Sequence, residues 1–117
     1  GTIQKLTVDD NELGYYRAIN MDSHGKRGKG LTKYFGMPMS HGVLTAKVSS
    51  PIPLRSGQIY LIASDGLTDY LHLGELMETA KKYSHSPDSI AEQLIRDVLN
   101  QENGGHDNLT VVVLKIL

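Results

Sequence analysis

Two acidic turns hold the residue types best suited to chemistry in this chain of 117 residues. Asp65 lies in the turn Ser64-Asp65-Gly66, directly after the apolar run 58–63, and Asp107 lies in the turn Gly105-His106-Asp107-Asn108, directly before the apolar run 109–117. In each turn a strand is expected to fix the backbone of a carboxylate, while a neighbouring glycine permits an open turn. If the two strands pair antiparallel, the end of one lies beside the start of the other. Both carboxylates are therefore expected at one edge of the sheet.

Two carboxylates at one edge repel each other unless a cation lies between them. Hard oxygen ligands of this kind suit Mg²⁺ or Mn²⁺, so the spacing predicts Asp65 and Asp107 as metal ligands. The alternative is that both are turn-forming residues at strand ends, as most Asp-Gly and Asp-Asn pairs are. The absence of cysteine from the chain excludes a thiolate zinc site and a Cys nucleophile.

Hydrophobic periodicity predicts the elements that position these turns. The run 58–63 (QIYLIA) is nearly all apolar, which predicts a central strand buried on both faces, and the β-branched run 109–117 predicts a closing strand. Apolar residues at helical spacing predict a helix over 73–83. Ser86, Pro87 and Asp88 are typical of the start of a second helix, which Asn103-Gly104-Gly105 should end.

The first half of the chain has weaker patterns. Residues 3–7 and 43–48 predict two short strands, and the glycine-rich segment 12–30 predicts an irregular, mobile stretch. The order of strands, two helices and a strand indicates an α+β fold with a mostly antiparallel sheet. The length suits one domain over residues 1–117.

Composition and charge exclude several classes of protein. Apolar residues make up 39% of the chain and charged residues 21%, which is typical of a globular domain and not of a disordered or fibrous chain. No apolar run approaches the length of a membrane span, and no signal-peptide pattern is present, so a cytoplasmic protein is expected. Four cations lie close together at Lys26, Arg27, Lys29 and Lys33. Without interleaved aromatic residues they indicate a solvated basic loop, and nucleic acid is not expected as a partner.

The two acidic turns and their surroundings resemble the C-terminal half of the metal-dependent Ser/Thr protein phosphatases, the PPM or type-2C family. Residues 62–69 (IASDGLTD) look like the family's "LxSDGLTD" motif, and residues 105–113 (GHDNLTVVV) look like its closing "GxDNxTVVV". Residues 4–9 (QKLTVD) are similar to the strand and turn that end in "LTxDH", with Asp10 and Asn11 where His and Ser are usual. Residues 31–36 (LTKYFG) are similar to "LTRxLG".

This resemblance implies a fold, an activity and site roles. The fold would be part of an αββα sandwich, with a binuclear Mg²⁺ or Mn²⁺ centre whose bound water attacks the phosphorus of phosphoserine or phosphothreonine in a phosphoprotein substrate. Asp65 would be a metal ligand, Asp107 the ligand of the second ion, and Gly66 and Asn108 would support the metal-binding loops. Segment 12–30 would correspond to the family's flap beside the active site. The resemblance implies no catalytic side chain among the 117 residues and does not identify the substrate-binding residues.

The chain also departs from the family pattern. The "DGxGG" motif with the bridging metal ligand, the Arg-containing phosphate-binding strand and the "GDSR" segment are absent from the 117 residues. We therefore expect the chain to be the C-terminal portion of a catalytic domain, incomplete at its N-terminal side and inert alone. Its strand edges would be covered by the missing N-terminal half or by self-association. The alternative is a non-catalytic PPM-like regulatory or interaction domain.

Overall fold

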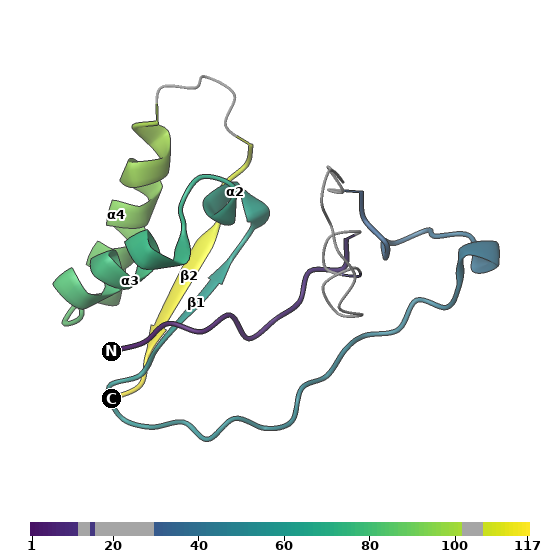
Figure 1. Ribbon diagram of the computed structural model, residues 1–117. Helices are drawn as coiled ribbons and strands as arrows, with labels where there is room; N and C mark the ends of the chain where they lie inside the picture. The colour runs from purple at the N-terminus through teal and green to yellow at the C-terminus, as the bar shows by residue number, and fades with distance from the viewer. Residues whose placement is uncertain (12–14, 16–29, 102–106) are drawn as a thin grey trace. The chain divides into compact units, whose positions relative to one another are not determined.

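The chain consists of two units in the computed structural model, which describes residues 1–11, 15, 30–101 and 107–117. Unit 1 comprises Gly1–Ile3 and Ile52–Leu117, and unit 2 comprises Gln4–Pro51 (Figure 1). The elements in chain order are η1 (Met39–His41), β1 (Ile59–Ala63), α2 (Asp65–Thr68), α3 (Leu73–Lys82), α4 (Pro87–Leu99) and β2 (Val111–Lys115). This mixture of helices and antiparallel strands confirms the predicted α+β class.

Strands β1 and β2 form the two-stranded sheet of unit 1. They pair antiparallel, with Ile59 opposite Lys115 at one end and Ala63 opposite Val111 at the other. Two further backbone bonds extend the ladder beyond Ile59: the Gly57 N–H donates to the Ile116 carbonyl (2.8 Å), and the Ile116 N–H donates to the Gln58 carbonyl (2.9 Å). The two apolar runs therefore pair antiparallel, which is the condition for a common edge.

The two long helices begin where local side chains satisfy their free N–H groups. Ser86 caps α4, since its Oγ accepts the Ser89 N–H (3.2 Å), and Pro87 takes the first helical position, where no backbone donor is needed. At the start of α3, Glu75 Oε2 accepts the His72 N–H (2.7 Å). Both helices confirm the sequence prediction to within one residue at the N-terminal end.

The core of unit 1 lies between these helices and one face of the sheet (Figure 1). Helix α4 packs on β2 and against α3. Its stripe of buried residues, Ile90, Leu94 and Val98, repeats every four residues and so faces one side. The buried set as a whole consists of Leu67, Leu71, Leu76, Ile90, Leu94 and Val98, and Ile59, Leu61, Val111 and Val113 of the sheet pack against it.

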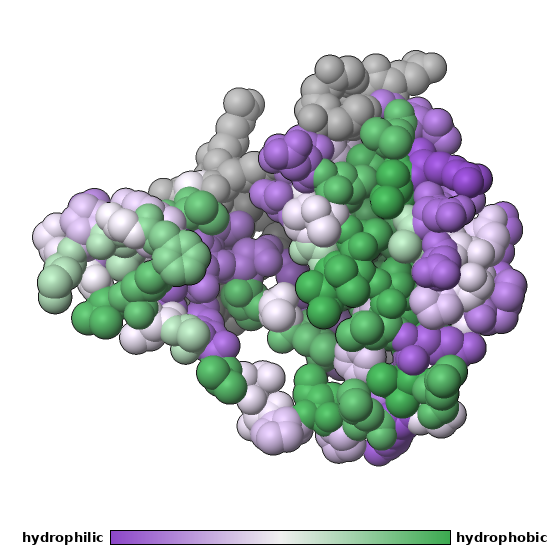
Figure 2. Space-filling view, turned by 180° about the vertical axis from the view of Figure 1, so that it is seen from behind, coloured by the Kyte–Doolittle hydropathy of each residue, from purple (hydrophilic) through white to green (hydrophobic). Residues whose placement is uncertain are grey.

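In the described part of unit 1, no helix or strand covers the opposite face of the sheet. Because successive strand residues point to opposite faces, Ile62, Val112 and Leu114 lie away from the core, and Ile62 is 60% exposed. Hydrophobic surface forms a band on this unit in Figure 2. The prediction that 58–63 is buried on both faces is therefore wrong, because helices cover only one face within the described residues. The second sheet of a sandwich stays a prediction.

Several local predictions also differ from the structure. Residues 3–7 and 43–48 form no strand, since neither has a ladder partner among the described residues. The turn predicted at 64–66 runs into a short helix, α2. The proposed flap, residues 12–30, lies outside the described residues, apart from Tyr15 and Gly30. The prediction that 103–105 ends the second helix is wrong, because α4 already ends at Leu99, with Asn100 as its C-cap. In unit 2, an antiparallel bridge joins Asn11 to Leu31 at the two ends of that segment.

Candidate metal centre

Asp65 and Asp107 belong to segments at the same end of the sheet. Asp65 is the first residue of α2, two residues after β1 ends at Ala63. Asp107 lies four residues before β2 begins at Val111. Since Ala63 and Val111 are paired, the chain leaves one strand and enters the other at this end.

Ser64 joins the two acidic segments by hydrogen bonds. Its backbone N–H donates to the Thr110 carbonyl (3.0 Å), which continues the ladder by one residue. Its hydroxyl donates to the Asn108 carbonyl (3.3 Å) and accepts the Thr110 N–H (3.1 Å). One side chain next to Asp65 thus satisfies two backbone groups of the segment that follows Asp107.

Gly66 allows the same two segments to lie in contact. The residue is buried, and a Cβ added to it would lie 2.5 Å from the Asn108 carbonyl oxygen and 3.4 Å from Leu109 Cα. No side chain fits in that space, so α2 meets the Asn108 backbone only because residue 66 is glycine. Gly66 and Asn108, which the resemblance names as loop supports, therefore touch each other directly.

The two carboxylates differ in their local partners. Asp107 Oδ1 accepts the N–H of the next residue, Asn108 (2.7 Å), which leaves its second oxygen for another donor or a cation. The Asp65 carboxylate makes no hydrogen bond or ion pair within the part of the chain that the structure describes. Both residues are exposed. Their oxygens suit a hard divalent cation that keeps several waters.

Two carboxylates are too few for a binuclear centre. Among residues 1–11, 15, 30–101 and 107–117, no group of three or more His, Asp or Glu side chains is arranged to hold a metal ion. The donor set of the described residues therefore does not fit two ions. This agrees with the missing bridging ligand in the sequence.

Sequence reasoning missed the positioning residue of this site. Ser64 lies in the "SDG" turn, where the motif points to the neighbouring aspartate and not to the serine side chain. A hydroxyl residue at the end of a buried strand, just before Asp-Gly, is a signal for a side-chain bond to the neighbouring segment. The partner, Thr110, could not be found this way because it lies 46 residues away.

In comparisons with known proteins, no protein-family model, curated protein or solved structure matches the chain. In the described residues, no helix has the length and apolar character needed to cross a membrane.

Proposed function

We propose that this chain is the C-terminal portion of a PPM-type, metal-dependent protein phosphatase that hydrolyses phosphoserine and phosphothreonine in proteins. Asp65 and Asp107 are its metal ligands, and Gly66 and Asn108 hold the two ligand loops together. The metal is Mg²⁺ or Mn²⁺, binuclear in the complete domain. Divalent ions, when bound, offset the charge of a phosphate group and hold it in line for attack by water.

One observation carries this proposal: the backbone contact between the Asp65 and Asp107 segments at a single sheet end. Ser64 donates to the Asn108 carbonyl at 3.3 Å, and a Cβ on residue 66 would collide with that same carbonyl. Turn-forming Asp residues have no need of a partner segment held this closely. The arrangement supports a site that both segments build together.

The uncovered sheet face supports the proposal that further polypeptide completes the domain. Ile62, Val112 and Leu114 form one exposed apolar face, and such faces on a sheet are normally covered by a second layer. We propose that the missing N-terminal half of the domain covers this face and supplies the bridging metal ligand. Self-association through strand edges is the competing arrangement, and sedimentation of the 117-residue chain would reveal it as a dimer.

A metal titration tests the ligand assignment without requiring turnover. Mn²⁺ added to the isotope-labelled 117-residue chain should broaden the amide signals of residues 64–66 and 107–110 first. Asp65→Asn and Asp107→Asn should each weaken that effect by about tenfold or more, since each removes a charged ligand from an all-oxygen site. The control is Asp88→Asn, which removes an exposed carboxylate in the first turn of α4. Equal broadening in all three variants would refute the site.

A turnover assay tests the activity. Phosphate release from a phosphothreonine peptide at millimolar Mn²⁺ should be negligible with the 117-residue chain, because two carboxylates cannot hold two ions. A longer polypeptide that includes the bridging aspartate should be active and should lose activity on Asp107→Ala. Rapid turnover by the 117-residue chain would contradict the need for a bridging ligand. A longer polypeptide that binds Mn²⁺ without turnover would favour the non-catalytic domain.

A further inference from the structure

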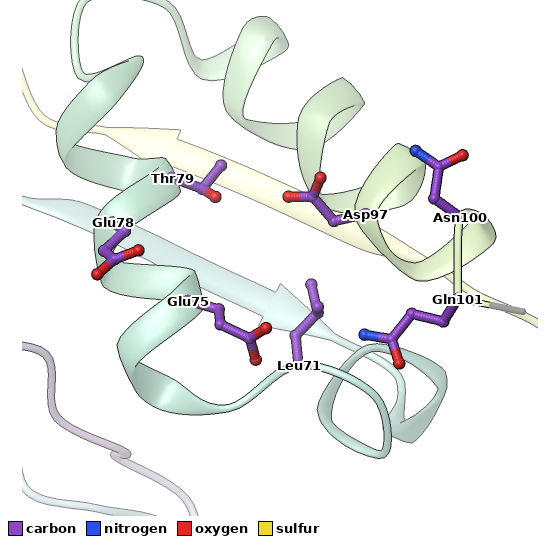
Figure 3. A pocket seen from close by; sticks show the side chains of 7 residues that line it. All are labelled: Leu71, Glu75, Glu78, Thr79, Asp97, Asn100 and Gln101. Carbon is purple, nitrogen blue, oxygen red and sulfur yellow. The ribbon is translucent and has the colours of Figure 1, made fainter.

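A cavity of unit 1 lies away from the metal centre, between helices α3 and α4 (Figure 3). It has a volume of about 370 Å³, and neither Asp65 nor Asp107 lines it. Three carboxylates line it, from Glu75, Glu78 and Asp97, and no Lys, Arg or His does. This volume is within the range of small-ligand pockets, and the excess of acceptors indicates a ligand that donates hydrogen bonds.

Local bonds orient the polar groups of this cavity and leave acceptor atoms unused. Glu75 Oε2 accepts the His72 N–H (2.7 Å), and Asp97 Oδ1 accepts from Gln93 Nε2 (2.7 Å), so each carboxylate keeps a second oxygen. Gln101 Nε2 donates to the Tyr70 carbonyl (3.2 Å), which leaves the Gln101 amide oxygen as another acceptor. These groups are held in place before any ligand arrives.

Thr79 provides an independent sign of a missing partner. Its side chain points from α3 into the space between the helices, towards Asp97 (Figure 3), and the residue is only 9% exposed. A helical threonine commonly bonds back to a carbonyl of the preceding turn, but the Thr79 hydroxyl makes no hydrogen bond within the described residues. Buried hydroxyls rarely lack a partner, so we expect a water or a ligand group in the cavity to supply one.

The occupant must be positively charged and must offer several donors at once. A single metal ion does not fit, because no three acidic or His side chains converge within the described residues. A guanidinium group fits better: it is planar, always charged and carries five N–H donors, whereas an ammonium is a compact point charge with three. Its aliphatic stem would also contact Leu71, which lines the cavity.

We propose that this cavity binds an arginine side chain of a partner protein. The guanidinium lies between Glu75 and Asp97, and the Thr79 hydroxyl and the Gln101 amide oxygen accept its remaining N–H groups. The proposal concerns docking of another protein on the helical layer. It is independent of the phosphatase proposal, because no atom of the metal centre takes part.

A peptide titration tests the proposal directly. The full 117-residue chain is isotope-labelled, and amide shifts are followed while acetyl-Gly-Arg-Gly-amide is added to about 10 mM, well above a millimolar dissociation constant. Shifts are expected at residues 75–79 and 97–101. The citrulline analogue has the same shape without the charge and should bind about tenfold more weakly. Absence of any shift with the arginine peptide would overturn the proposal and leave the cavity to water.

Variants locate the binding. Glu75→Gln with Asp97→Asn keeps acceptors at both positions, including the helix cap, and should weaken arginine binding by about tenfold. The matched control is Glu92→Gln, which removes a carboxylate of the same helix that pairs with Arg96 outside the cavity. Equal weakening by the control would show non-specific attraction and would overturn the site.

Thr79→Val provides a test that does not depend on charge. Valine has the same shape without the hydroxyl, so the free protein should be as stable as before or more stable, while arginine binding should weaken several-fold. Thr79→Ser should restore binding. Unchanged affinity in the Val variant would exclude the hydroxyl from the site and overturn the proposed geometry.

Discussion

Unit 1 and unit 2 contain similar residue types but gain stability in different ways. In unit 1, apolar residues recur at helical and strand periods, and six of them form a buried core. In unit 2, no described residue is buried, and Phe35 is 96% exposed. The difference shows that apolar content alone does not build a core: the residues must also recur on one face of an element.

The described part of unit 2 has ion pairs and backbone hydrogen bonds but no buried core. Asp10 Oδ1 lies 3.1 Å from Lys47 Nζ and 3.8 Å from Lys33 Nζ, and Asp9 pairs with Lys5. Exposed pairs of this kind contribute little, because water and salt screen them. The candidate metal ligands Asp65 and Asp107 both belong to unit 1, where a packed core fixes the strands that precede and follow them.

Truncation of a buried leucine in unit 1 should have the largest effect on the free energy of unfolding. Leu94→Ala removes a fully buried side chain from the face of α4 in the core and should lower the free energy of unfolding by about 2–5 kcal/mol. The same substitution in unit 2, Leu31→Ala, affects a side chain that is already 66% exposed and should cost within about 0.5 kcal/mol. Urea unfolding followed by far-ultraviolet circular dichroism measures both. Equal losses would refute the contrast between the units.

A methyl group at residue 66 should have the next largest effect. Gly66→Ala places a Cβ 2.5 Å from the Asn108 carbonyl oxygen, so the two acidic segments must move apart. The expected cost is about 1–3 kcal/mol, as for overpacking, together with weaker Mn²⁺ binding. Gly74→Ala is the matched control, because nothing lies within 4 Å of its added Cβ and alanine favours a helix. If both variants have the same stability, the close approach at residue 66 does not matter.

The parts that could be predicted from the sequence are those with a strong period or cap. The stripe Ile90, Leu94 and Val98 and the Ser86-Pro87 start were sufficient for α4, and the β-branched runs were sufficient for β1 and β2. The run 43–48 is equally β-branched but forms no strand, because a strand also needs a partner and sequence does not reveal one. Exposure of the Ile62 face could not be predicted, since an apolar run does not show which layers are present to cover it.

The sequence predicts part of the candidate site, because the two strands beside it have strong patterns. Two carboxylates flanking two apolar strands predict a common edge as soon as the strands are assumed to pair. Ser64 bonds to Asn108 and Thr110, which lie more than 40 residues away along the chain. Only the fold shows these contacts. The acidic cavity was missed because Glu75, Glu78 and Asp97 lie on two helices and share no local motif.

Loss of the Ser64 hydroxyl should have a moderate effect. Ser64→Ala leaves the Thr110 N–H without its side-chain acceptor and removes the bond to the Asn108 carbonyl, so we expect a cost of about 1–2 kcal/mol. Ser84→Ala is the control, since Ser84 is exposed and its hydroxyl makes no hydrogen bond within the described part of unit 1. Urea unfolding compares the two. A Ser64 variant as stable as the Ser84 variant would show that water replaces the lost bonds.

The smallest effect is expected in unit 2, where one carboxylate faces two lysines. Asp10→Asn removes the negative charge near Lys33 and Lys47 but keeps the backbone carbonyl that accepts the Thr32 N–H (2.9 Å). Hydrogen exchange of the Thr32 amide should therefore become faster by about two- to fivefold at low salt, which corresponds to the modest value of exposed ion pairs. Asp9→Asn, which removes a single pair with Lys5, should have less effect on that amide.

Because salt screens these pairs, the difference between the two variants should vanish at about 1 M salt. If the faster exchange of Thr32 in Asp10→Asn persists at about 1 M salt, Asp10 stabilises unit 2 by packing or hydrogen bonding and not by charge. Ion pairs would then not distinguish unit 2 from unit 1.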